Sequence, residues 1–249
     1  MTASDTEAVR RILVVQHEDG TGPGLVGDEL IRSGLSLRVV HPWNGDRIPD
    51  SLRGCAGLLV LGGAPNCDDD AAAPWLPAVR ALVREAVDTG LPLLGICLGG
   101  QIIASALGGS VAARTQGPEV GAVPLRRLPG ADGDPVFGAV PDGAPGAQWH
   151  WDEIAELPPH AVPLLTGDDC RYQAFRVGER AWGVQFHPEV LGDAVADWSR
   201  SDGPAVAGAG GDPDAAVAAV RAAEPALRAV WSEASRAWGR VVREHGTRG

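Results

Sequence analysis

Short apolar runs and longer amphipathic segments alternate along the first two thirds of the chain. Four of the apolar runs have the length of buried strands, and they cover residues 11–16, 35–40, 55–61 and 91–96. Segments with helical character lie between and after them, over residues 24–33, 74–89 and 99–107. Strands that alternate with helices in this way are joined by right-handed crossovers. This part of the sequence therefore predicts an α/β fold with a largely parallel sheet flanked by helices.

The pattern changes after Ser110. The strand-like runs become short and are separated by clusters of glycine, proline and aspartate; they cover residues 121–128, 161–165, 173–177 and 181–185. This region predicts antiparallel strands added to the parallel sheet.

The last part of the chain is rich in alanine and predicts a helix over residues 214–245, with a break or kink at Pro225. Residues 205–212, just before it, predict a loop. The helix carries an apolar stripe, which we expect to pack against the body of the protein; docking of a partner is the alternative. We thus expect one domain over residues 1–249, with its core at about 11–190 and a helical C-terminal extension at about 191–246.

Composition narrows the possible chemistry. All 21 basic residues are arginine, which excludes chemistry centred on lysine, such as a P-loop or a pyridoxal-phosphate Schiff base. The net charge of −11 and the lack of a basic run argue against nucleic acid as a partner. No pair of histidines has the spacing of metal ligands, and we expect neither a metal nor another cofactor.

The cysteines and the N-terminal residues indicate the cellular compartment of the protein. No CxxC pair occurs among Cys55, Cys67, Cys97 and Cys170. Residues 1–11 lack the apolar run of a signal peptide, and no apolar stretch has the length needed to span a bilayer. We therefore expect a cytoplasmic protein with free thiols and no association with a membrane.

Cys97 is the candidate nucleophile, because it lies where a buried strand turns directly into a helix. Residues 95–101, GICLGGQ, have the form of the GxSxG nucleophile elbow with cysteine in place of serine. Glycines beside the nucleophile let strand and helix pass close together through a strained turn. The free N–H groups of the helix N-terminus favour the reactive thiolate. The alternative is a buried, inert cysteine beside an ordinary glycine turn.

His187 is the candidate base. It follows an apolar run that is typical of a strand, and Pro188 biases it toward an extended backbone. In an extended segment residues i and i+2 point the same way, so the Glu189 carboxylate can hold one ring nitrogen and leave the other facing the thiol. A histidine at a strand end beside a surface glutamate is the alternative for this segment taken alone.

A third segment, Leu61-Gly62-Gly63, ends another predicted strand. Its glycine turn can offer a bare backbone N–H to a developing oxyanion. The N–H of Leu98, directly after the nucleophile, is the natural second donor.

Together these segments resemble the signature blocks of the class I, triad-type, glutamine amidotransferase domain: LGG at 61–63, GICLGGQ at 95–101 and GVQFHPE at 183–189. The resemblance implies a flavodoxin-like core and hydrolysis of a γ-carboxamide through a γ-glutamyl thioester. It assigns roles to Cys97 as nucleophile, His187 as general base and acid, and Glu189 as orienter of the histidine. It also places an oxyanion hole at the N–H groups of Gly63 and Leu98.

The same resemblance implies further substrate contacts. Gln101 matches a family position that helps to hold the substrate. The segment Gln148-Trp149-His150 falls where the family binds the α-groups of glutamine through its backbone. Ala64-Pro65 departs from the family pattern, which usually has proline directly after the two glycines.

Within the family, this chain most resembles the stand-alone members that are similar to GMP synthase. No ATP-pyrophosphatase motif such as SGGxDS follows the triad, so we expect a glutaminase unit without an acceptor domain. One hypothesis is a glutamine-hydrolysing protein that supplies ammonia to a separate synthetase partner. The alternative is a stand-alone hydrolase of γ-glutamyl amides or peptides. A catalytically silent binding or regulatory domain is disfavoured, because all three triad positions are filled.

Overall fold

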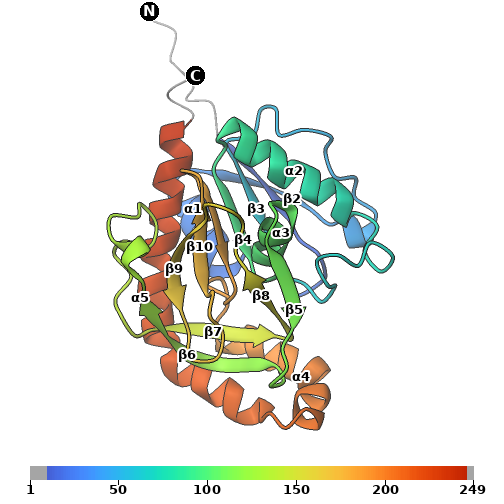
Figure 1. Ribbon diagram of the computed structural model, residues 1–249, viewed down its shortest axis with the longest axis vertical. Coiled ribbons are helices and arrows are strands. Elements are labelled where there is room, and N and C mark those ends of the chain that lie inside the picture. The colour runs from blue at the N-terminus through green and yellow to red at the C-terminus, as the bar shows by residue number, and fades with distance from the viewer. Residues whose placement is uncertain (1–9, 246–249) are drawn as a thin grey trace, which may run out of the picture.

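A computed structural model describes residues 10–245 of the chain (Figure 1). Its main sheet has nine strands in the order β2-β1-β3-β4-β11-β10-β9-β6-β7. In chain order these strands are β1 (Arg11–Val15), β2 (Ser36–Val40), β3 (Gly57–Val60), β4 (Leu93–Ile96), β6 (Glu119–Arg127), β7 (Ala144–His150), β9 (Val162–Thr166), β10 (Ala174–Val177) and β11 (Ala181–Val184). The remaining strands pair as a small second sheet: β5 (Ser110–Ala113) and β8 (Asp152–Glu156).

The main sheet changes from parallel to antiparallel pairing at β11. Strands β2, β1, β3, β4 and β11 run parallel, and β10, β9, β6 and β7 follow as antiparallel neighbours. This confirms the predicted parallel sheet with added antiparallel strands. Strand β11 belongs to the region where the sequence predicts antiparallel strands, yet it pairs in parallel with β4, with Val184 beside Ile96. Its carboxyl end therefore lies next to the carboxyl end of β4.

Helices cover both faces of the sheet, as Figure 1 shows. The helices are α1 (Gly24–Arg32), α2 (Leu76–Thr89), α3 (Leu98–Ala106), α4 (Gly192–Gly208) and α5 (Pro213–His245), with short 3-10 turns at Pro42–Asn44 and Pro129–Ala131. Alternate residues of β1 point to opposite faces: Ile12 and Val14 pack in the cluster with α1 and α5, whereas Leu13 and Val15 pack in the cluster with α2 and α3. The sheet is thus buried on both sides, as its apolar strands require.

The C-terminal helices correct two predictions. Residues 205–208, expected as the start of a loop, form the last turn of α4. Of the break or kink predicted at Pro225, the break is wrong, because α5 runs continuously through that residue. Proline removes one backbone hydrogen bond of the helix, but buried side chains on both sides, Val220 and Leu227, hold the two halves against the core. The expectation that the apolar stripe packs against the body is confirmed, since Trp231, Trp238 and Val242 are also buried there.

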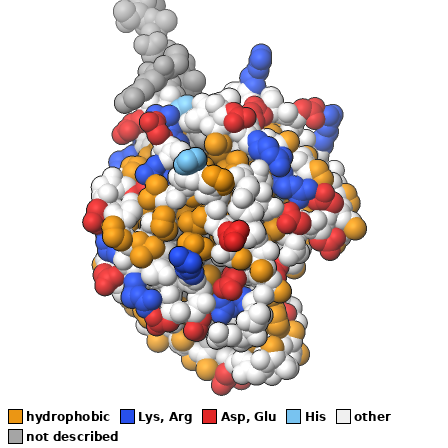
Figure 2. Space-filling model, viewed as in Figure 1, with side chains coloured by type: hydrophobic (Ala, Val, Ile, Leu, Met, Phe, Trp, Pro, Cys, Tyr) orange, Lys and Arg blue, Asp and Glu red, His pale blue; other side chains and the backbone are white. Residues whose placement is uncertain are grey.

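Residues 1–9 and 246–249 lie outside the described part of the chain, so the N-terminal segment compared with a signal peptide is not described apart from its last two residues. Within residues 10–245, no helix has both the length and the apolar character needed to cross a membrane. All four cysteines are free thiols. Acidic and basic side chains are interspersed on the face of the molecule seen in Figure 2.

Candidate active site

Cys97 occupies a strained position between β4 and α3. Its backbone has φ 49° and ψ −107°, in a region that non-glycine residues seldom adopt and that costs about 1–3 kcal/mol. The Cys97 N–H donates to the carbonyl of Val184 (2.8 Å), and its carbonyl accepts from the N–H of Gln101 (2.9 Å). Both neighbouring elements, strand β11 and helix α3, therefore hold the strained conformation in place.

The glycines around Cys97 are explained by close approach of the backbone. A Cβ on Gly95 would lie 2.4 Å from the carbonyl oxygen of Gly99, and one on Gly99 would lie 2.1 Å from that of Val60. A Cβ on Gly100 would lie 2.5 Å from the oxygen of Val184. No side chain larger than hydrogen fits at these three positions, so helix α3 can pack directly against β3 and β11.

His187 follows β11 and is almost completely buried. Its N–H donates to the carbonyl of Ala147 (2.8 Å), and its ring Nδ1 lies 2.7 Å from Oε1 of Glu189. The other ring nitrogen, Nε2, has no hydrogen-bond partner among the described residues. With Nδ1–H donating to the carboxylate, Nε2 is left free to exchange a proton with a group in the pocket, the arrangement required of a general acid and base.

Gly62 brings the cysteine and the histidine together. A Cβ on Gly62 would lie 3.0 Å from Cε1 of His187 and 3.6 Å from Cβ of Cys97, so the bare backbone of Gly62 lies against both side chains. The structure therefore brings together Cys97, His187 and Glu189, the three residues of the predicted triad.

The charged groups of this cluster change the pKa of His187. Burial by itself lowers the pKa of the imidazole, but the Glu189 carboxylate and the Cys97 sulfur outweigh burial and raise the pKa to about 10. A histidine held protonated beside a cysteine stabilises the thiolate, which is the nucleophilic form of the sulfur.

The two predicted oxyanion donors belong to the glycine turn after β3 and to the first residue of α3. Gly63 lines the same pocket as Cys97, and its N–H donates no hydrogen bond to another described residue. Leu98 is the first residue of α3, so its N–H has no partner within the helix. Behind the turn, His17 packs so closely that a Cβ on Gly63 would lie 2.6 Å from Cβ of His17.

A pocket of about 450 Å³ opens above Cys97. It is lined by Glu18, Thr21, Gly63, Ala64, Pro65, Cys97, Gln101, Trp149, His150, Trp151, Asp152, His187, Trp198, Ser201 and Asp202. Of the predicted substrate contacts, Gln101, Trp149 and His150 are in this lining. The Gln148 side chain is not, because it is buried behind the pocket and donates to Oε1 of Gln173 (2.8 Å).

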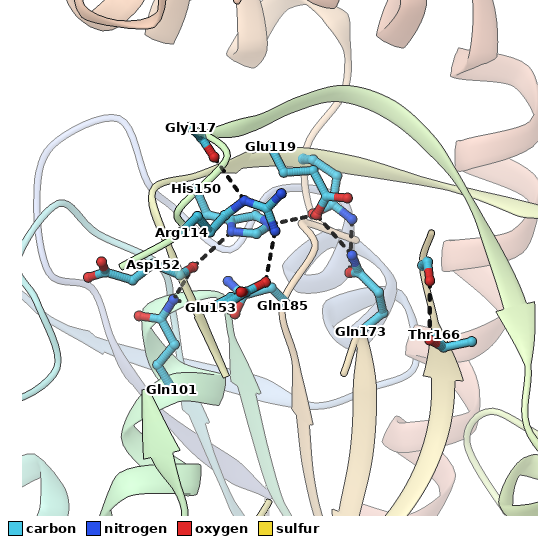
Figure 3. A network of polar contacts seen from close by, with 12 residues as sticks. Gln101, Arg114, Gly117, Glu119, His150, Asp152, Glu153, Thr166, Gln173 and Gln185 are labelled. Atoms are coloured by element: carbon cyan, nitrogen blue, oxygen red, sulfur yellow. Dashed lines mark hydrogen bonds and ion pairs between the residues drawn. The ribbon is translucent and has the colours of Figure 1, made fainter. Parts of the chain in front are cut away.

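A buried polar network supports the floor of the pocket (Figure 3). His150 bridges the Asp152 carbonyl (2.8 Å at Nδ1) and the Glu119 carboxylate (2.8 Å at Nε2), and Gln101 donates to the same carbonyl (3.0 Å). Burial alone raises the pKa of Glu119, but hydrogen bonds to His150 and Gln173 and the charge of His150 outweigh burial and lower the pKa. The network fixes the side chains of Gln101 and His150 before any substrate binds.

One group within the described residues has the composition of a metal site. Ligand atoms of Glu119, His150 and Cys170 lie within 4.8 Å of one another, and all three residues are buried. Both ring nitrogens of His150 are already engaged, with Glu119 and with the Asp152 carbonyl. Burial, which is the largest cause, raises the pKa of the Cys170 thiol well above its ordinary value and favours the neutral form over the thiolate that metals bind. These partners suit a hydrogen-bonded core better than a metal ligand set.

Three lining residues on α4, Trp198, Ser201 and Asp202, carry no sequence motif. The ring of Trp198 meets the ring of His187 edge-on, with centroids 4.8 Å apart. The one available signal is a lone tryptophan in the otherwise polar stretch 197–202.

A comparison of the sequence with known protein families agrees with the geometry of the site. The family model described as "Glutamine amidotransferase class-I" matches residues 26–195. That range includes the predicted triad and ends within the first turn of α4.

Named relatives agree with this match. A component of the glutamine-hydrolysing GMP synthase from Thermoplasma acidophilum is 33% identical over 158 residues, which are 63% of this chain and 73% of the relative. The glutamine-hydrolysing GMP synthase of Leifsonia xyli subsp. xyli is 37% identical over 137 residues, which are 53% of this chain and 25% of that relative. The match thus spans only about a quarter of the length of the Leifsonia protein.

Two crystal structures share almost the whole fold. The glutamine amidotransferase from Methylobacillus flagellatus has a TM-score of 0.82 at 26% identity, and the match covers 94% of this chain and 95% of that one. The glutamine amidotransferase from Thermotoga maritima has a TM-score of 0.80 at 26% identity, with 92% and 98% covered. These similarities confirm the expected flavodoxin-like fold. The chain belongs to the class-I glutamine amidotransferase family.

Proposed function

We propose that the protein hydrolyses the side-chain amide of glutamine through a covalent γ-glutamyl thioester on Cys97. One observation carries this proposal: the strained Cys97 and the unpartnered Nε2 of His187 line the same pocket, with Glu189 bonded to the opposite ring nitrogen. This is the arrangement of a nucleophile, a base and an orienting group. A catalytically silent domain would have no use for the backbone strain at Cys97.

The first half of the proposed reaction forms the thioester. The Cys97 thiolate attacks the amide carbon, and the N–H groups of Gly63 and Leu98 stabilise the oxyanion. Protonated His187 then gives its proton to the nitrogen, the carbon–nitrogen bond breaks, and ammonia leaves.

The second half releases glutamate. Neutral His187 takes a proton from water, the resulting hydroxide attacks the thioester carbon, and the carbon–sulfur bond breaks. Glutamate leaves, and the thiolate and the protonated imidazole are restored.

For the ammonia we propose a separate synthetase as acceptor. Support comes from the named relatives, since the Thermoplasma acidophilum protein is one component of a glutamine-hydrolysing GMP synthase. A cytoplasmic location fits the four free cysteines, which a reducing compartment maintains.

The test is glutamate release by the purified chain from glutamine, with Cys97→Ala as the blank. We expect Cys97-dependent release that increases when a synthetase partner is added. Equal release by wild type and Cys97→Ala would disprove the thiol mechanism. If no synthetase changed the rate and other γ-glutamyl compounds were hydrolysed faster than glutamine, the protein would be a stand-alone hydrolase and not an ammonia donor.

A further inference from the structure

Two carboxylates of the active-site pocket come from outside the region that the family model matches. Glu18 follows β1 and Asp202 lies on α4, whereas the match covers residues 26–195. Both line the pocket into which Cys97 and the buried, unpartnered Nε2 of His187 open. The proposed thioester chemistry uses neither carboxylate, so the two groups need another explanation.

Asp202 is held in place by two indole rings. Its Oδ2 accepts hydrogen bonds from the N–H of Trp149 (3.0 Å) and of Trp151 (3.1 Å), and both tryptophans line the same pocket. Neither indole N–H bonds to Oδ1. One carboxylate oxygen thus fixes the position of the group, and the other can accept a hydrogen bond from a ligand.

Glu18 adds a second negative charge beside Asp202. Burial, the largest cause, raises the pKa of the Glu18 carboxyl group, and the charge of Asp202 raises it further, whereas the Ala64 backbone and His187 lower it. The two carboxylates therefore lie close enough to repel each other. A cation placed between them would replace this repulsion by attraction.

The protein supplies no such cation from within the pocket lining. The lining residues, all from the described part of the chain, include no arginine, and the sequence has no lysine. The third carboxylate of the lining, that of Asp152, already accepts from the side-chain amide of Asn66 (2.8 Å). The two remaining carboxylates are thus arranged for a cation that arrives with the substrate.

Glutamine brings one cation, its α-ammonium group. Its amide must face Cys97 and the N–H groups of Gly63 and Leu98, so its α-groups extend toward the rest of the lining. Asp202 is bonded to Trp149, which belongs to the segment predicted to contact these α-groups. This bond puts Asp202 on the side of the pocket that the α-groups of glutamine would reach.

We propose that Asp202 and Glu18 bind the α-ammonium group of glutamine, so that hydrolysis requires a free α-amino group. A hydrogen bond from an ammonium to a carboxylate is stronger than one between neutral groups. The inference rests on the proposed glutamine hydrolysis and deepens it, because it names the substrate class as the free amino acid. A glutamine residue inside a peptide chain is excluded, since its α-nitrogen is an uncharged amide.

The first experiment compares glutamine with glutaramate, which is glutamine with hydrogen in place of the α-ammonium group. Ammonia release measures both reactions. We expect kcat/KM for glutamine to exceed that for glutaramate by about tenfold to a hundredfold, the range of a hydrogen bond to a charged group. Equal values would overturn the inference and leave the thiol mechanism intact. Absence of Cys97-dependent release from both compounds would overturn the proposed function as well.

A substitution at Asp202 locates the preference. Asp202→Asn keeps an oxygen that accepts from both indole N–H groups but removes the charge. We expect KM for glutamine to rise about tenfold with little change in kcat, and kcat/KM for glutaramate to stay the same. Asp197→Asn is the matched control, because Asp197 lies on the same helix, pairs with Arg200 and does not line the pocket.

Glu18→Gln is a second variant that leaves the indole bonds of Asp202 untouched. We expect it also to reduce the preference for glutamine over glutaramate. If Asp202→Asn lowered kcat/KM for both substrates equally, Asp202 would act only by holding the tryptophans, and the inference would be wrong. An undiminished preference in both variants would likewise overturn it.

Discussion

The backbone N–H of Cys97 donates to the carbonyl of Val184, at 2.8 Å. This single bond joins the end of β4 to the end of β11, three residues before His187. Because the two strands are parallel neighbours, the nucleophile and the base leave the sheet at the same edge. Their proximity is thus a property of strand pairing, and a local change at either strand end should affect the chemistry more than the stability.

Gly62→Ala tests the close contact between the glycine turn and the histidine. The new methyl group would lie 3.0 Å from Cε1 of His187, so the ring must move by a few tenths of an ångström. We expect kcat/KM to fall by about tenfold with little change in the urea midpoint, since small misplacements of catalytic groups are costly. Gly208→Ala is the control, because no atom lies within 4 Å of a Cβ there. Unchanged activity in Gly62→Ala would contradict the described contact.

Substitution of Cys97 separates strain from chemistry. Cys97→Ala and Cys97→Gly should both lose activity, because neither carries sulfur. The φ of 49° favours glycine, so we expect Cys97→Gly to exceed Cys97→Ala in unfolding free energy by about 1 kcal/mol. Urea denaturation with equal m-values measures this difference. An alanine variant as stable as the glycine variant would show that the turn is relaxed.

His187 and Glu189 should differ in their effect on the rate. His187→Asn removes the base and is expected to lower kcat by about 10²–10⁴-fold. Glu189→Gln keeps an oxygen near Nδ1, which lies 2.7 Å from the present carboxylate, so the loss should be smaller. Single-turnover release of glutamate is the measurement. A Glu189→Gln loss as large as that of His187→Asn would require a second role for the carboxylate.

His17 should limit stability in acid. Burial lowers the pKa of His17 to about 4, whereas histidine in an unfolded chain titrates near 6.5. The folded state therefore binds fewer protons, and stability that is complete above pH 6.5 is lost as the pH falls toward 4, by up to about 3 kcal/mol. His17→Gln keeps an acceptor for the Trp75 indole, 3.0 Å from Nδ1 of His17. Its unfolding free energy should fall less over this range; parallel curves for variant and wild type would refute the assignment.

The parallel half of the fold and the triad could be predicted because their signals are local. Buried strands such as β3 and β4 are continuous apolar runs, and glycines mark the strand ends where the chemistry lies. Strand β7 could not be predicted, because its side chains form buried polar pairs such as Gln148 with Gln173, which no apolar alternation reveals. The alignment of β11 with β4 also depends on tertiary pairing.

The part of α4 that lines the pocket could not be predicted from the sequence for a different reason. Trp149 and Trp151 meet Asp202 across more than fifty positions, and no periodic pattern links residues so far apart. The continuity of α5 at Pro225 likewise depends on what the helix packs against and not on its own propensity.

The anchoring of Glu189 has a consequence for how this protein can change. Its carbonyl accepts from the N–H of Leu25 (2.9 Å), and Gly24 lies so close that a Cβ there would be 2.2 Å from the same oxygen. The orienting residue is thus fastened to the first turn of α1, although α4 begins only three residues later, at Gly192. Changes in α4 therefore reach the catalytic histidine through the ring of Trp198, and not through the backbone that carries its orienting carboxylate.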